Sequence, residues 1–173
     1  MTPFPLGFDP PGPRMYRSSL VTRDPERSFL IFAEHQFRGA SRYRKRDVTG
    51  DGLPETFCNV HTVDTAEAHD IHMPRGLRAN QLIEWLEAEA AKKLPQGWAS
   101  IDAHVAQAMA DAGQFAVACW KNPDPKKPGH IAPLEPSLGE SGTWISNVGA
   151  INFLRGRVAQ AFGELVVSYF GNP

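Results

Sequence analysis

The chain has 173 residues, of which 42% are hydrophobic and 21% are charged, and its formal net charge is −1. This length suits one domain with a hydrophobic core. The balanced charge argues against nucleic acid or an anionic membrane as the partner. No apolar run approaches the ~18 residues of a membrane span.

The two cysteines, Cys58 and Cys119, are too few for a disulfide framework. One disulfide is an alternative, but synthesis in a reducing compartment is the simpler interpretation. Residues 1–14 show no basic region followed by an apolar stretch, so we expect no secretory signal. The sequence therefore predicts a protein made in the cytoplasm, which a secretion system or phage lysis must deliver to any substrate outside.

Hydrophobic patterning predicts a Pro-rich N-terminal extension at residues 1–24 and a single domain at residues 25–173. Helices are expected at 25–44, 56–68, 81–93 and 101–112, and strands at 115–120, 130–134, 143–148 and 165–170. Because helices come first and antiparallel strands follow, the order indicates an α+β fold.

Single residues support these boundaries. Asn80 and Ser100 suit the capping position before a helix, and Gly113 suits the position after a helix end. Pro133 lacks a backbone N–H, which restricts its strand to a sheet edge or a bulge. We expect Asp64 on the solvent side of its helix.

Cys58 lies where a polar loop turns into a predicted helix. A thiol in the first turn of a helix meets the positive end of the helix dipole, which favours the nucleophilic thiolate. We therefore interpret Cys58 as a catalytic nucleophile. Cys119, inside an apolar strand, is interpreted as a buried structural residue.

A cysteine nucleophile needs a base, and the base needs a group that orients its ring. Of the six histidines, His130 is the best placed, because it follows a Pro-Gly turn and opens a strand. Asn147, on the next predicted strand, is the candidate that orients the imidazole. The alternatives are that His130 is an ordinary loop histidine and that Asn147 only caps a turn.

An ordered set of short motifs accompanies these residues across roughly residues 43–170. The motifs are Cys58-Asn59, Ala79-Asn80, the apolar strand Phe115 to Trp120, Gly129-His130, Ile145-Ser146-Asn147 and Gly149 to Phe153. This order resembles the papain-like cell-wall hydrolases of the NlpC and CHAP groups, which include phage lysins and amidase effectors of the type VI secretion system. The resemblance implies a papain-like fold, with N-terminal helices and the nucleophile at a helix N-terminus packed on an antiparallel sheet.

The resemblance also implies roles for single residues. Cys58 would be the nucleophile, His130 the base, and Asn147, or alternatively Asn152, the orienting residue. The backbone N–H of Cys58 would help to hold the oxyanion. Tyr43 would correspond to an upstream tyrosine found near the nucleophile in some relatives.

Asn59 is a candidate supporting residue, because it completes the Cys-Asn pair. His61 departs from the family pattern, since an apolar or aromatic residue is expected one turn after the nucleophile. It is interpreted as a helix-face histidine, and a supporting role at the site is the alternative. Pro133 is a second departure, because it interrupts the strand after the base.

The resemblance therefore implies a cysteine-dependent amidase or endopeptidase that cleaves peptidoglycan stem peptides through a thioester and requires no cofactor. As an antibacterial effector it would need a cognate immunity protein as a partner. Two alternatives stay open: a papain-like deamidase or acyltransferase acting on a protein, and a non-enzymatic, calcium-stabilised structural or interaction module.

The loop before Cys58 contains part of an EF-hand calcium pattern. Asp47, Thr49, Asp51 and Glu55 occupy ligand positions 1, 3, 5 and 9, and Gly52 occupies the turn position. Position 12 is Cys58 rather than the bidentate glutamate, so a plain polar turn is the alternative to a Ca²⁺ site. His69 and His72 are a weaker candidate for a transition metal, because they lie in a connection expected to be solvated.

Overall fold

Two helices open the part of the chain that the structure, a computed structural model, describes: residues 43–48, 50 and 55–173. They are α3 (Cys58–Ala68) and α4 (Ala79–Ala91), and each agrees with a predicted helix to within about two residues. The first predicted helix and the extension before it lie outside the described residues, apart from a turn at its C-terminal end.

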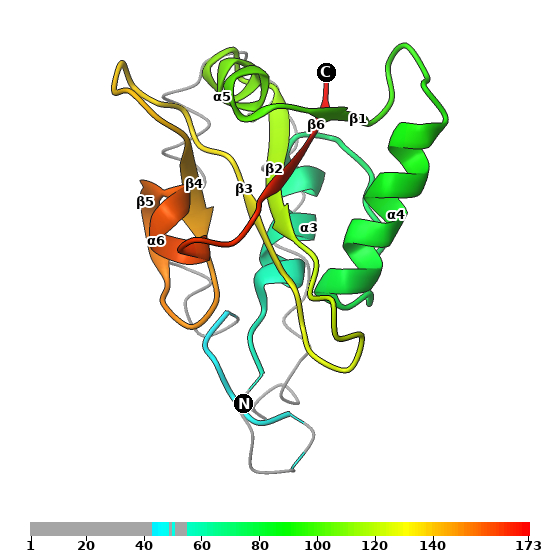
Figure 1. Cartoon of the computed structure of the whole chain (residues 1–173), viewed down its shortest axis with the longest axis vertical. Helices are drawn as coiled ribbons and strands as arrows, with labels where there is room; N and C mark the ends of the chain where they lie inside the picture. The colour runs from blue at the N-terminus through cyan, green and yellow to red at the C-terminus, as the bar shows by residue number, and fades with distance from the viewer. Residues whose placement is uncertain (1–42, 49, 51–54) are drawn as a thin grey trace, which may run out of the picture.

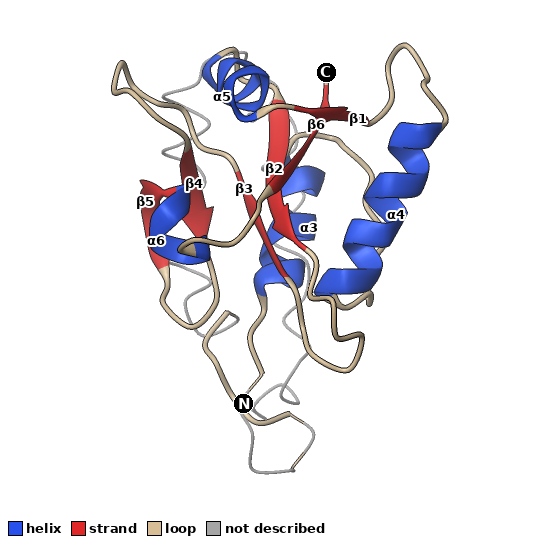
Figure 2. Cartoon of the chain, viewed as in Figure 1, coloured by secondary structure: helices blue, strands red, loops and turns tan. Residues whose placement is uncertain are grey.

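The strands form two antiparallel sheets, so the fold is mixed α+β (Figure 2). The larger sheet has the order β1-β6-β2-β3, and the smaller sheet pairs β4 with β5. The strands are β1 (Ala99–Ile101), β2 (Phe115–Trp120), β3 (His130–Pro133), β4 (Trp144–Asn147), β5 (Phe153–Arg157) and β6 (Ser168–Asn172). An isolated bridge between Leu134 and Ile145 joins the two sheets beside the end of β3.

The larger sheet is buried on both faces because helices cover each side. Phe115, Val117 and Cys119 of β2 pack in one core cluster with residues of α3 and α4. Ala116 and Ala118 point the other way, into a cluster with α5 (Ala103–Asp111) and α6 (Val158–Phe162). Figure 1 shows β4, β5 and α6 together beside the larger sheet. In the part of the chain that is described, no helix has both the length and the apolar character needed to cross a bilayer.

Of three residues with predicted boundary roles, one differs from its prediction and two agree. Ser100 does not cap a helix but lies inside β1, and the cap of α5 is Asp102, whose carboxylate accepts the Val105 N–H at 2.8 Å. Gly113 confirms its prediction, because it follows the end of α5 with φ of +73°. Pro133 lies at the end of an edge strand, as its missing N–H requires.

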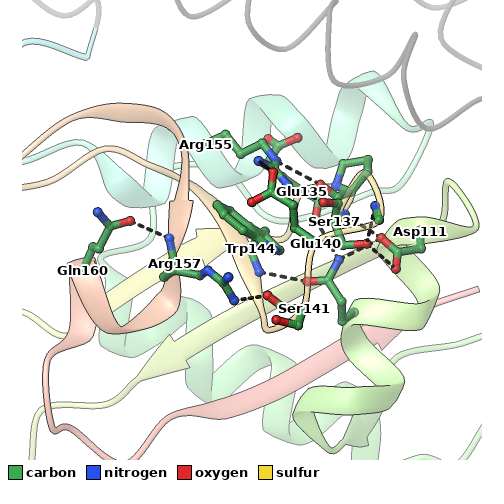
Figure 3. A network of polar contacts seen from close by, with 12 residues as sticks. Asp111, Glu135, Ser137, Glu140, Ser141, Trp144, Arg155, Arg157 and Gln160 are labelled. Carbon is green, nitrogen blue, oxygen red and sulfur yellow. Dashed lines mark hydrogen bonds and ion pairs between the residues drawn. The ribbon is translucent and has the colours of Figure 1, made fainter.

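A polar network ties down the loop between β3 and β4 (Figure 3). Arg155 donates from Nε to the Pro136 carbonyl at 3.1 Å and from Nη1 to Glu140 at 2.9 Å. The guanidinium groups of Arg155 and Arg157 lie 3.7 and 4.1 Å from the centre of the Trp144 ring. Stacked cations of this kind are favourable on an indole face. The network therefore holds β4 at its first residue.

Candidate active site

Cys58 is the first residue of α3, and its side chain is only 3% exposed. Burial raises the pKa of the Cys58 thiol, and hydrogen bonding from the backbone of Ile131, Asn59 and Cys58 itself lowers that pKa only in part. Burial thus acts against the thiolate that the helix start is expected to favour, because desolvation penalises the charged form. The resting form is a neutral thiol.

His130 is the first residue of β3, and its Nε2 lies 2.7 Å from Oδ1 of Asn147 at the end of β4. The Asn147 amide nitrogen donates to the Ile151 carbonyl at 2.6 Å, which leaves its oxygen to face the imidazole. Nε2 must then carry the hydrogen of this bond. In the neutral ring, Nδ1 is the nitrogen that can accept a proton.

The imidazole of His130 is held on further sides. The Phe162 ring of α6 packs against it, with 4.8 Å between the ring centres and an angle of 53°. Gly149 also lies close, because a Cβ at this position would be 3.1 Å from Cε1 of His130. Asn152 accepts the Gly149 N–H at 2.9 Å, so it shapes this wall, and Asn147 is the asparagine that contacts the imidazole.

The elements that carry Cys58 and His130 pack against each other, since α3 contacts β3. The backbone that hydrogen-bonds the Cys58 thiol belongs to Ile131, the neighbour of His130. Thr62 bridges the two elements, because its hydroxyl donates to the Cys58 carbonyl at 2.9 Å and lies 3.5 Å from the Ile131 carbonyl. The N-terminal end of α3 and the start of β3 thus meet at one place.

Burial lowers the pKa of His130, and the hydrogen bond to Asn147 raises it only in part. The imidazole is therefore neutral at pH 7. The Cys58 thiol packs in the core cluster with Ile131 and Cys119, whereas the His130 ring packs against Phe162 of the second cluster. Neutral forms of the two groups would suit general-base activation of the nucleophile at the moment of reaction, rather than a preformed ion pair.

Tyr43 and His61 belong to a buried cluster on α3. Their rings meet edge to face, with 5.1 Å between the centres, and the Tyr43 hydroxyl donates to Asp64 at 2.8 Å. Arg75 pairs with the other oxygen of Asp64 at 2.9 Å. The prediction that Asp64 faces solvent is therefore wrong, because this carboxylate joins the segment before the polar loop to α3. Asn59 donates to the Leu77 carbonyl at 2.7 Å and ties the start of α3 to the chain before α4.

Two of the four candidate calcium ligands, Thr49 and Asp51, lie outside the described residues. Of the others, Asp47 accepts the Gly50 N–H at 2.6 Å and Glu55 accepts the Val48 N–H at 2.7 Å. These bonds are those of a polar turn. Among the described residues, no group of three His, Cys, Asp or Glu side chains is placed to hold a metal ion, and no such group includes His69 or His72.

Some residues at this site had no predicted role there. Phe162 and Gly149 contact the His130 ring, and Thr62 bridges its strand to α3. Gly149 stands in the last of the ordered motifs, which is the signal that could have identified it. Phe162 and Thr62 carry no comparable signal, since apolar and hydroxyl side chains are frequent throughout the chain.

The chain matches no protein-family model, and no curated protein matches it either. The chemistry assigned to this site therefore rests on its geometry and on the resemblance of the ordered motifs.

Proposed function

We propose that this protein is a papain-like cysteine hydrolase that cleaves amide bonds of peptidoglycan peptides through a thioester. The observation that carries the proposal is the His130–Asn147 contact at 2.7 Å, with the amide orientation fixed by the Ile151 carbonyl. In this bond Nε2 is the donor, which leaves Nδ1 unprotonated as a base on the strand that packs on the helix opened by Cys58.

In the proposed reaction, Nδ1 of His130 takes the thiol proton as the Cys58 sulfur attacks the substrate carbonyl carbon. The carbonyl oxygen becomes an oxyanion, which the Cys58 backbone N–H helps to hold. One such donor is worth about 3 kcal/mol in acyl transfer. The imidazolium then protonates the leaving amine as the carbon–nitrogen bond breaks, and a thioester remains.

Hydrolysis of the thioester reverses these roles. A water molecule gives a proton to Nδ1 of His130 and attacks the thioester carbon. The carbon–sulfur bond breaks, the sulfur recovers the proton, and a carboxylic acid leaves. The neutral resting forms of both groups support this cycle, since it begins and ends with a thiol and an unprotonated Nδ1.

The substrate class is supported by the ordered motifs between residues 43 and 170, which resemble cell-wall hydrolases. We infer stem peptides of peptidoglycan as the substrate and delivery by a secretion system or phage lysis. In the first case a cognate immunity protein would protect the producing cell.

A second candidate function is favoured by the burial of Cys58, which is 3% exposed. A thiol in the core can be a small apolar residue of a non-enzymatic interaction module. The two functions differ in whether an electrophile can reach the sulfur in the folded protein.

Native-state alkylation tests this difference. A nucleophile must be reached by its substrate, so the hydrolase proposal requires iodoacetamide to label Cys58 in the folded protein although it is only 3% exposed, while Cys119, which is 1% exposed in the same core cluster, stays unlabelled. Cys119 is thus a reference inside the same molecule, and peptide mapping after digestion gives both rates. If both thiols react only once urea unfolds the chain, Cys58 is a structural residue and the hydrolase proposal fails.

A further inference from the structure

Asn80 is the second residue of α4, and its side chain leaves the helix to bind the loop at residues 121–129. Its Oδ1 accepts the Asn122 N–H at 3.0 Å, and its Nδ2 donates to the Lys127 carbonyl at 3.2 Å. Arg78 is the residue that precedes α4, so the expectation that Asn80 caps this helix is wrong. One amide therefore joins both ends of the loop that leads into β3.

The loop is also bonded to itself. Asn122 donates from its side chain to the Pro128 carbonyl at 3.2 Å and accepts the Asp124 N–H at 3.0 Å. The Asp124 carboxylate in turn accepts the Lys126 N–H at 3.0 Å. These bonds give the loop one conformation, and Asn80 attaches that conformation to α4.

Gly129 connects this loop to His130, the proposed base. A Cβ at Gly129 would overlap with the side-chain oxygen of Asn80 and lie 2.5 Å from the Trp120 carbonyl oxygen. Only glycine allows so close an approach. Trp120 is the strand partner of His130, so Gly129 passes between α4 and the strand β2 immediately before the base.

We propose that Asn80 is a positioning residue for His130, which sets the start of β3 through the 121–129 loop and Gly129. This inference rests on the proposed function, since it assigns Asn80 a role in placing the base of that reaction. Small displacements of a catalytic group are costly, and about 1 Å can reduce a rate on the order of 100-fold.

The test compares Asn80→Ala with Gln81→Ala. Gln81 is the next residue of α4, and its side chain is bonded within the start of the helix, where it accepts the Arg78 N–H at 2.9 Å. We expect Asn80→Ala to lower kcat for peptide cleavage by roughly tenfold or more, with KM nearly unchanged, and Gln81→Ala to leave kcat within about twofold. Asn80→Asp retains the acceptor for Asn122 but loses the donor to Lys127, so its kcat should fall between wild type and Asn80→Ala.

A second readout does not depend on cleavage. The nitrogen chemical shifts of the His130 ring report which nitrogen carries the proton, and wild type should show the Nε2–H form that Asn147 selects. Asn80→Ala should give a mixture of the two forms, and Gln81→Ala should not. If Asn80→Ala keeps the wild-type shifts and the wild-type kcat, the positioning role is wrong. If wild type itself cleaves no peptide, the proposed function fails, and the ring shifts still decide the role of Asn80.

Discussion

At the scale of single residues, the site depends on how Asn147 divides its two polar atoms. Its nitrogen donates to Ile151 and its oxygen accepts from His130. The motif order identified His130 and Asn147 as a pair, but the fixing of the amide by Ile151 could not be predicted, because it depends on the backbone path of the turn after β4.

The pH dependence of cleavage should reflect the lowered pKa of His130. Protonation of Nδ1 removes the base, so kcat/KM should fall as the pH falls through the pKa of His130. Because burial lowers this pKa, the acid limb should have its midpoint below the ordinary value of about 6.5. A measured midpoint clearly above 6.5 would mean that the base is not the buried His130.

Replacing Asn147 by alanine should be more harmful than replacing Asn152. Asn147→Ala removes the group that selects the Nε2–H form of His130, and we expect kcat to fall on the order of 10- to 100-fold. Asn152→Ala removes only the acceptor for the Gly149 N–H and should cost less than about tenfold. Steady-state kinetics of both variants gives the comparison, and the reverse order would identify Asn152 as the orienting residue.

At the scale of elements, sequence patterning predicted those segments whose burial produces a clear pattern. β2 lies where the uninterrupted apolar run predicted it, because helices cover both faces of the sheet. β5 was missed, because its two arginines stack on Trp144 and give a half-buried strand a charged sequence. β6 begins three residues later than predicted, at Ser168, since Val166 before it is 88% exposed.

The cap of α5 provides a test at this scale. Asp102→Ala removes the acceptor for the Val105 N–H, and we expect the free energy of unfolding to fall by about 1 kcal/mol. Ser100→Ala, two residues earlier in β1, should change it by less than about 0.5 kcal/mol, because Ser100 is exposed. Denaturant unfolding of the two variants distinguishes the two candidate caps. A larger effect at Ser100 would mean that Ser100, as predicted from the sequence, caps the helix.

At the scale of the whole molecule, the fold assembles the site from distant parts of the chain. The candidate nucleophile opens α3, the candidate base opens an edge strand of the larger sheet, and the orienting amide ends a strand of the smaller sheet. Patterning could predict these elements one by one. It could not predict that α3 packs on β3, because such contacts join segments far apart in sequence.

Glu135 is expected to make the free energy of unfolding depend on pH. Its carboxyl is 1% exposed, and burial raises its pKa from 4.5 to about 8 although Ser146 and Arg155 act to lower it. Between these two values the folded protein keeps a proton that the unfolded chain loses, so the free energy of unfolding should decrease as the pH rises from about 4.5 to about 8. Below that range both states are protonated and the penalty is absent.

Glu135→Gln should remove this dependence, because its amide is neutral at every pH. We expect the variant to have a higher Tm than wild type at pH 8 and a nearly equal Tm at pH 5. Glu164→Gln, at an exposed position, is the matched control and should change neither value. A Glu135→Gln variant that is less stable than wild type at pH 8 would contradict this prediction, because it would show that other groups in the folded protein offset the cost of burying the carboxylate.

The measurement that tests the central claim most directly is digestion of purified peptidoglycan, with the products identified by mass spectrometry. Wild type and Cys119→Ala should release the same fragments, whose masses identify the cleaved amide bond. Cys58→Ala, once its circular dichroism spectrum shows that it is folded, should release none. Fragments from Cys58→Ala at the wild-type rate would contradict the assignment of Cys58 as the nucleophile. No fragments from any of the three proteins would contradict peptidoglycan as the substrate.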